Sequence, residues 1–274
     1  IRYMSMENLK KILRPNQITQ EKSDLDNYGK DWSIYYPAKP QAVVFPETHQ
    51  EVIEIVKWAR QHKTALVPSG GRTGLSSAAT ASHNEVVVSF ERMNQIIDFD
   101  ETDLILKVQP GVILQTVQEF AQKHGYYFPV DFGAKGSCHI AGAVSTNAGG
   151  VKVIRYGMMR SWVQGLRLVT GTGEEIYCNK ALKKNATGYD LRHLVTGSEG
   201  TLGLITEVEL QLAPAPKPLH VMLFGLEQLS QTIDVFKTFN KKLSITACEF
   251  FSDLALNKVL AAHPTLLAPL ESRY

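Results

Sequence analysis

Glycine-dense segments recur four times along this chain, and their spacing is its clearest sign of a chemical role. They read PSGGRTGL from Pro68, DFGAKGSCHIAGAVSTNAGG from Asp131, RYG from Arg155 and GSEGTLGLIT from Gly197. Glycine adopts positive φ readily and lets main-chain N–H groups approach a ligand closely. Several such turns between strand-like runs predict a large ligand held mainly by backbone, and a dinucleotide with a pyrophosphate is the candidate.

Two common phosphate-binding devices do not match these turns. A Walker P-loop needs a lysine followed by Ser or Thr before a helix, whereas the turn at Gly70 ends in TGL. The nicotinamide-type Rossmann fingerprint needs G-x-G-x-x-G between a strand and a helix, and no stretch has that spacing. What remains is the segment 69–74, whose successive N–H groups could form an anion-binding nest or a tight turn without a ligand. Arg72 either adds charge there or points to solvent.

Hydrophobic periodicity predicts the elements that must position these turns. Thr48 and Glu51 match a capping box before an amphipathic helix. With the apolar runs 42–45 and 65–67 this helix forms a small β-α-β unit. Other segments predict strands at 86–90, 104–108 and 205–212, a helix at 113–124 closed by Gly125, and a hairpin of 165–170 with 174–178.

A proline cluster, Pro214-Ala-Pro216-Lys-Pro218, predicts a domain boundary. After it we expect a strand at 220–224, a helix at 226–239 and a strand at 245–250. That order indicates the start of a second α+β domain. We therefore expect one domain over residues 1–216 and an incomplete one over 217–274, with the protein continuing beyond Tyr274.

Composition excludes some function classes. The chain has 274 residues, 44% apolar and 20% charged, which is ordinary for a globular protein. A net charge of +2 offers no electrostatic footprint for nucleic acid, and no stretch approaches the roughly 20 apolar residues of a transmembrane segment. Three scattered cysteines do not form a disulfide framework and favour a reducing compartment. We expect a cytoplasmic protein, with the inner-membrane periphery or the mitochondrial matrix as alternatives.

Taken together in this order, the four segments resemble the flavin-binding domain of the vanillyl-alcohol-oxidase-type, or PCMH-type, family. The likeness runs from Pro40 to Leu212. Within the family, GAKGSCHI, KKNATGYDL and GSEGTLG are similar to D-2-hydroxyglutarate dehydrogenases and their D-lactate dehydrogenase relatives. The resemblance implies an α+β fold, with an FAD-binding domain of two α/β subdomains followed by the truncated start of an α+β substrate (cap) domain.

The resemblance also implies the cofactor contacts. The pyrophosphate loop would be Ser69, Gly70, Gly71, Arg72, Thr73, Gly74 and Leu75. The flavin and ribityl contacts would be Gly136, Ser137, Ile140, Gly142, Ala143, Thr146 and Asn147, with Pro129, Asp131, Tyr156 and Gly157 in the same matching segments. The last motif, closing on the adenine and ribityl side, would supply Glu199, Gly200 and Ile205.

Some members of the family attach flavin covalently through a histidine in the first loop. Here that region has Arg72, so non-covalent FAD is expected, and Cys138 is interpreted as a small buried residue rather than a flavin attachment. The chain departs from the family pattern at three places, namely Ala141, Ala186 and the pair Ser76-Ser77. Each departure could weaken flavin binding or alter a loop.

By resemblance, the reaction oxidises a D-2-hydroxy acid to the 2-oxo acid, with hydride passing to flavin N5 and a base taking the hydroxyl proton. The resemblance places the base, the carboxylate anchor and a divalent metal in the substrate domain. Catalytic residues are thus expected beyond Tyr274, with no metal site in this chain. A quinone, a cytochrome or an electron-transfer flavoprotein would accept the electrons, and a homodimer is expected. The alternatives are an alcohol oxidase, an ether-lipid synthase, or a flavin-binding fragment that needs a partner chain.

Overall fold

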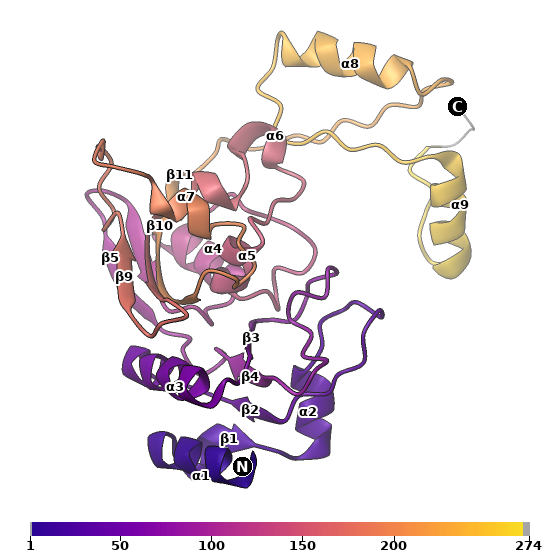
Figure 1. The fold of residues 1–274 in the computed structure, drawn as a ribbon. Helices are drawn as coiled ribbons and strands as arrows, with labels where there is room; N and C mark the ends of the chain where they lie inside the picture. Colours follow the sequence, from indigo (N-terminus) through magenta and orange to yellow (C-terminus); the bar gives the residue numbers. More distant parts are fainter. Residues whose placement is uncertain (1, 271–274) are drawn as a thin grey trace. The chain divides into compact units, whose positions relative to one another are not determined.

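The computed structural model describes residues 2–270 and contains two compact units (Figure 1). Unit 1 comprises Ile1–Gly150 and Met158–Ala215, and unit 2 comprises Val151–Gly157 and Pro216–Tyr274. The short segment 151–157 therefore groups with the chain after the proline cluster. The expected domains, 1–216 and 217–274, stay a prediction, and residues 271–274 of the second lie outside the described residues.

Unit 1 begins with a four-stranded sheet in the order β1-β2-β4-β3, in which β2, β4 and β3 are parallel and β1 is antiparallel. Its strands are β1 (Ile18–Thr19), β2 (Ala42–Val44), β3 (Leu66–Ser69) and β4 (Val86–Ser89), and the nearby helices are α1 (Arg2–Ile12), α2 (Lys22–Tyr28) and α3 (His49–His62). The capping box is confirmed, because Thr48 Oγ1 accepts a hydrogen bond from the Glu51 N–H at 3.2 Å and Glu51 Oε2 accepts one from the Thr48 N–H at 3.2 Å.

A second, five-stranded antiparallel sheet in unit 1 has the order β5-β6-β10-β8-β9. Its strands are β5 (Ile96–Asp100), β6 (Ile105–Val108), β8 (Val163–Val169), β9 (Glu175–Cys178) and β10 (Leu204–Gln211). Apolar residues of β6, β8 and β10 are buried in one core with residues of α4 (Leu114–Lys123) and α5 (Ile140–Ser145). The expected strands, the helix at 113–124 and the hairpin are thus confirmed, with ends shifted by one or two residues.

Shorter elements complete unit 1. They are the 3₁₀ turns η1 (Pro15–Gln17) and η2 (Met159–Ser161), the pair β7 (Tyr126–Tyr127) and β11 (Ala213–Pro214), and α7 (Leu191–Val195).

Unit 2 contains α6 (Val153–Tyr156), α8 (Gln231–Asn240) and α9 (Asp253–Ala262). The expected helix at 226–239 is present in shortened form as α8, and α9 was not expected. The strands expected at 220–224 and 245–250 are wrong, because neither segment is a strand in the part of the chain that is described. An apolar run becomes a strand only when a neighbouring strand pairs with its N–H and C=O groups, and no such pairing occurs here. No described helix is both long and apolar enough to cross a membrane.

Candidate cofactor site

A cavity of about 550 Å³ lies within unit 1, at the carboxyl ends of the parallel strands β3 and β4. Its lining combines the turn 70–76 after β3, residues of α5 and the segment after it, and the turn 199–205 that leads into β10. Three of the four glycine-dense segments therefore meet around one space. Its volume falls in the range of about 300–1,000 Å³ that is usual for small-molecule sites.

The expected site residues divide into those that line this cavity and those that do not. The lining residues are Ser69, Gly70, Gly71, Arg72, Thr73, Gly74, Leu75, Gly142, Thr146, Glu199, Gly200 and Ile205. Pro129, Ile140 and Ala143 are buried instead of lining the cavity. Gly136 and Ser137 are exposed in the loop before α5. Tyr156 and Gly157 belong to unit 2.

Two expected residues make local polar contacts next to the cavity rather than line it. Asp131 Oδ1 pairs with Lys135 Nζ at 2.9 Å, one turn along the loop that precedes α5. Asn147, with φ of 48°, accepts a hydrogen bond from the Arg160 N–H at 2.9 Å. This bond fixes the chain just after α5, where Thr146, Ala148 and Gly149 line the cavity.

Glycine is required where these segments touch. A Cβ on Gly71 would overlap the carbonyl oxygen of Ser137, so the first turn and the loop before α5 are in backbone contact. Gly200 has φ of +80°, and a Cβ there would overlap the Pro68 ring at the end of β3. A side chain at either position would push apart two of the three lining segments.

Buried polar atoms without a partner gather beside the first turn. Ser69 Oγ, at the end of β3, has no hydrogen-bond partner in the structure, and neither do Asp31 Oδ2 or His139 Nδ1. Ser69 and Asp31 line the cavity, and Gly70 lies against the His139 side chain. Buried polar groups are nearly always paired in folded proteins. Such a cluster at the edge of a glycine-lined cavity fits a polar ligand that would supply the missing partners.

Charged residues of both signs line the cavity, namely Arg72, Asp31 and Glu199. Burial, helped by the charge of Arg72, lowers the pKa of His139 to about 4, so its imidazole is neutral at pH 7. The Arg72 guanidinium lies 4.4 Å from the centre of the Tyr28 ring, and Tyr28 Oη donates to Glu91 Oε2 at 2.9 Å. Arg72 is therefore held by a cation–π contact at the cavity wall, and its backbone has φ of 56°.

Cys138 also lines the cavity, but its thiol is unsuited to attack a bound ring. Burial raises the pKa of Cys138 to about 11, and the thiol donates weakly to the His139 carbonyl at 3.5 Å. A thiolate is the reactive form of cysteine, and the fraction ionised at pH 7 is very small. This is compatible with a dissociable cofactor. The described residues contain no cluster of three or more His, Cys, Asp or Glu able to hold a metal ion.

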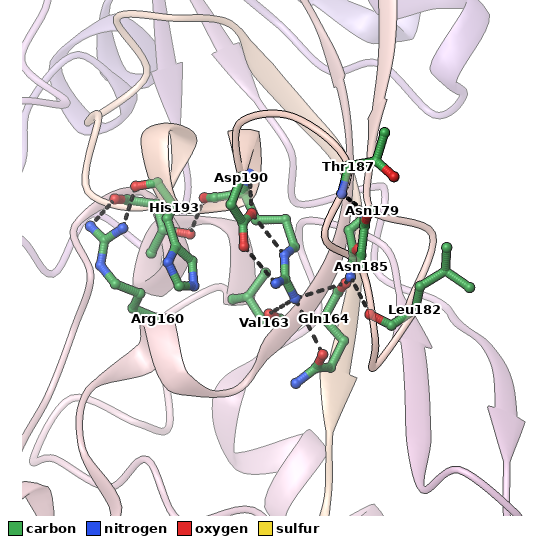
Figure 2. A network of polar contacts seen from close by, with 11 residues as sticks. Arg160, Val163, Gln164, Asn179, Leu182, Asn185, Thr187, Asp190 and His193 are labelled. Atoms are coloured by element: carbon green, nitrogen blue, oxygen red, sulfur yellow. Dashed lines mark hydrogen bonds and ion pairs between the residues drawn. The ribbon is translucent and has the colours of Figure 1, made fainter.

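A polar network, shown in Figure 2, holds the segment that leads into the last glycine turn. Arg160 donates to the carbonyl oxygens of His193 and Thr196. Arg192 Nη2 pairs with Asp190 Oδ2 at 2.7 Å, which lowers the pKa of Asp190, and Arg192 Nη1 donates to the Val163 carbonyl at 3.1 Å. These bonds tie α7 to β8 and thereby help to position Glu199 and Gly200 at the cavity.

Several lining residues were missed by the sequence reasoning, most of them because they belong to no motif. Phe90, Pro110 and Asp31 are examples. Ser145 and Ala148 lie inside the glycine-dense segment from Asp131, so that segment was the signal that could have found them. Asp31 stands in a loop about forty positions before the first turn, and nothing in its local sequence marks it.

Comparison with known proteins gives results that agree with this geometry. The family described as FAD binding domain matches residues 40–179. A D-2-hydroxyglutarate dehydrogenase of Stutzerimonas stutzeri is 49% identical over 93% of this chain and 55% of its own length. A protein of the same name from Xanthomonas citri is 46% identical over 95% of this chain and 54% of its own length. A mitochondrial D-2-hydroxyglutarate dehydrogenase of Bos taurus is 34% identical over 94% of this chain and 47% of its own length.

The chain thus spans about half the length of the curated relatives it matches. A solved structure of an alkyldihydroxyacetonephosphate synthase superposes with a TM-score of 0.69 at 23% identity, over 79% of this chain and 41% of that one. A likeness at this identity concerns the fold alone, and it agrees with the expected α+β architecture.

Proposed function

We propose that this chain, which belongs to the FAD binding domain family, is the cofactor-binding part of an FAD-dependent dehydrogenase of D-2-hydroxy acids. D-2-hydroxyglutarate is the proposed substrate, with D-lactate as the alternative, and a 2-oxo acid is the product. The observation that carries the proposal is the cavity in which three glycine segments meet beside buried polar atoms without partners. The names of the relatives support the substrate class.

In this proposal the chain's own residues bind and orient the cofactor without attaching it. The N–H groups of residues 69–75 would hold the pyrophosphate, with the Arg72 guanidinium adding positive charge. Gly142, Thr146, Glu199, Gly200 and Ile205 would contact the rest of the cofactor. The expected residues of unit 1 that do not line the cavity would act by holding these segments together. When bound, FAD would supply the acceptor for the hydride that leaves the hydroxy acid.

The remaining chemical groups are proposed to lie outside the described residues. Arg72 is the one Lys or Arg among the described lining residues of the cavity, and it is assigned here to the pyrophosphate. A cation for the substrate carboxylate would therefore come from a substrate domain, of which residues 217–274 are the proposed start. The base for the hydroxyl proton and a divalent metal are proposed to come from the same domain. We further propose that a quinone, a cytochrome or an electron-transfer flavoprotein accepts the electrons. The protein would form a homodimer and would be located in the cytoplasm.

Absorption spectroscopy tests the cofactor part of this proposal. We expect the purified chain, supplied with FAD and desalted, to retain flavin absorption bands, and acid precipitation to release them into the supernatant. A chain that retains no flavin would contradict the proposal, and flavin that stays in the pellet would contradict non-covalent binding. For the substrate, we expect D-2-hydroxyglutarate to bleach the flavin band anaerobically in a longer protein that contains this chain, and the L isomer to leave the band unchanged.

A further inference from the structure

The two carboxylate oxygens of Asp31 differ in their hydrogen bonding. Oδ1 accepts hydrogen bonds from the Ser33 N–H at 2.8 Å and from the Thr80 hydroxyl at 3.3 Å. Oδ2 has no partner, although the residue is only 6% exposed. Leaving a buried acceptor unpaired costs about 1–3 kcal/mol, and more when the group is charged. The cost indicates that Oδ2 has a partner that the chain itself does not provide.

The residue that carries the unpaired oxygen lines the cavity. Asp31 is one of its lining residues, and a Cβ placed on Gly74 would lie 3.6 Å from Oδ2. The loop that carries Asp31 is bonded to the same turn, since the Trp32 N–H donates to the Gly74 carbonyl at 2.9 Å. The Asp31 N–H is itself 3.4 Å from Thr80 Oγ1. The carboxylate is therefore held in a fixed position at the end of the first glycine turn.

The chemistry of Oδ2 limits what it can bind. An ionised carboxylate only accepts hydrogen bonds, and no described basic side chain forms an ion pair with Asp31. A phosphate oxygen beside it would be repelled, because like charges at short range in a poorly hydrated site interact strongly. The ligand atom must therefore be a donor. In a dinucleotide, the groups directly flanking the pyrophosphate are sugar chains that carry hydroxyl donors.

We propose that Asp31 is a positioning residue for the bound dinucleotide, with its Oδ2 accepting a hydrogen bond from a sugar hydroxyl next to the pyrophosphate. The hydroxyl belongs either to the ribose of the adenosine half or to the ribityl chain of the flavin half. The inference rests on the proposed binding of FAD. Asp31 would add directional contact beside a turn that otherwise binds through backbone groups.

The test compares FAD affinity in two variants of the purified chain, measured by the quenching of flavin fluorescence. In Asp31→Asn the amide oxygen keeps the bonds to Ser33 and Thr80, and the NH₂ group replaces Oδ2. We expect the Kd for FAD to rise about tenfold or more, as for the loss of a hydrogen bond to a charged group. The control is Thr80→Val, which weakens the support of Asp31 but leaves Oδ2 in place, and we expect its Kd within about threefold of the parent value. Thermal unfolding without FAD shows whether both variants fold.

Two fragments of the cofactor identify the sugar and separate a ligand contact from a structural effect. A loss of affinity in Asp31→Asn for FMN but not for ADP supports the ribityl hydroxyls, and the reverse supports the ribose. Equal losses for both fragments, or equal losses in Thr80→Val, would overturn the inference in favour of a structural role. Unchanged or tighter FAD binding by Asp31→Asn would also overturn it, since tighter binding indicates repulsion of the pyrophosphate. If the parent chain does not bind FAD, the proposed function fails together with this inference.

Discussion

Burial of His139 makes the free energy of unfolding depend on pH. Its side chain is 9% exposed, and burial, with the charge of Arg72, lowers its pKa to about 4 from the ordinary 6.5. Between these two values the unfolded chain binds a proton that the folded chain does not, so stability falls as the pH falls. The free energy of unfolding should therefore lose roughly 3 kcal/mol from this residue between pH 6.5 and pH 4, at about 1.4 kcal/mol per unit. We expect His139→Asn to lose correspondingly less over that interval in urea unfolding.

A matched control for this prediction is His83, whose side chain is 83% exposed. His83→Asn makes the same substitution at an exposed position, so it shows what the loss of an imidazole does when burial is not involved. If His139→Asn and the parent lose the same free energy of unfolding between pH 6.5 and pH 4, the result contradicts the interpretation that His139 stays neutral in the folded chain.

At the scale of elements, the site depends on a backbone contact between the turn after β3 and the loop before α5. Gly71 lies where a Cβ would overlap the Ser137 carbonyl oxygen. Gly71→Ala must separate the two segments, and we expect it to lower the free energy of unfolding by about 1–3 kcal/mol, as overpacking does. FAD affinity should fall as well, because both segments border the cavity. Gly133→Ala is the control, since a Cβ there meets nothing within 4 Å, and its effect should stay within about 0.5 kcal/mol. Equal stabilities of the two variants would contradict the contact.

How far the sequence predicts each element depends on where its stabilising partners lie. The capping box of α3 is local, because Thr48 and Glu51 are three positions apart, and it was predicted. The run from His220 to Phe224 is almost entirely apolar, as in many strands, but a strand also needs a neighbour, and the described chain offers none there. The first glycine turn lines the cavity and is marked in the sequence by its glycines, whereas Asp31 reaches the cavity through contacts with Gly74 and Thr80 that are distant in sequence.

At the scale of the whole molecule, the two units differ in how much apolar surface they bury. Unit 1 holds the buried clusters of the described chain, whereas no described residue of unit 2 is buried. Val221 is 97% exposed, Leu267 91% and Phe250 68%. Unit 2 should therefore contribute little to cooperative unfolding.

Removal of residues 216–274 tests this division. Because the described lining of the cavity and the buried clusters lie in unit 1, we expect the fragment 1–215 to bind FAD within about threefold of the parent Kd. Its thermal midpoint should lie within a few degrees of the parent value, since few buried contacts are lost. Binding of a hydrophobic dye such as ANS should fall, because the exposed apolar side chains are gone. In the intact chain, the paired change Val221→Ser and Phe250→Ser should reduce dye binding in part and leave the midpoint unchanged. A fragment that is unfolded, or that loses FAD affinity while the paired variant keeps it, would mean that unit 2 supports the site.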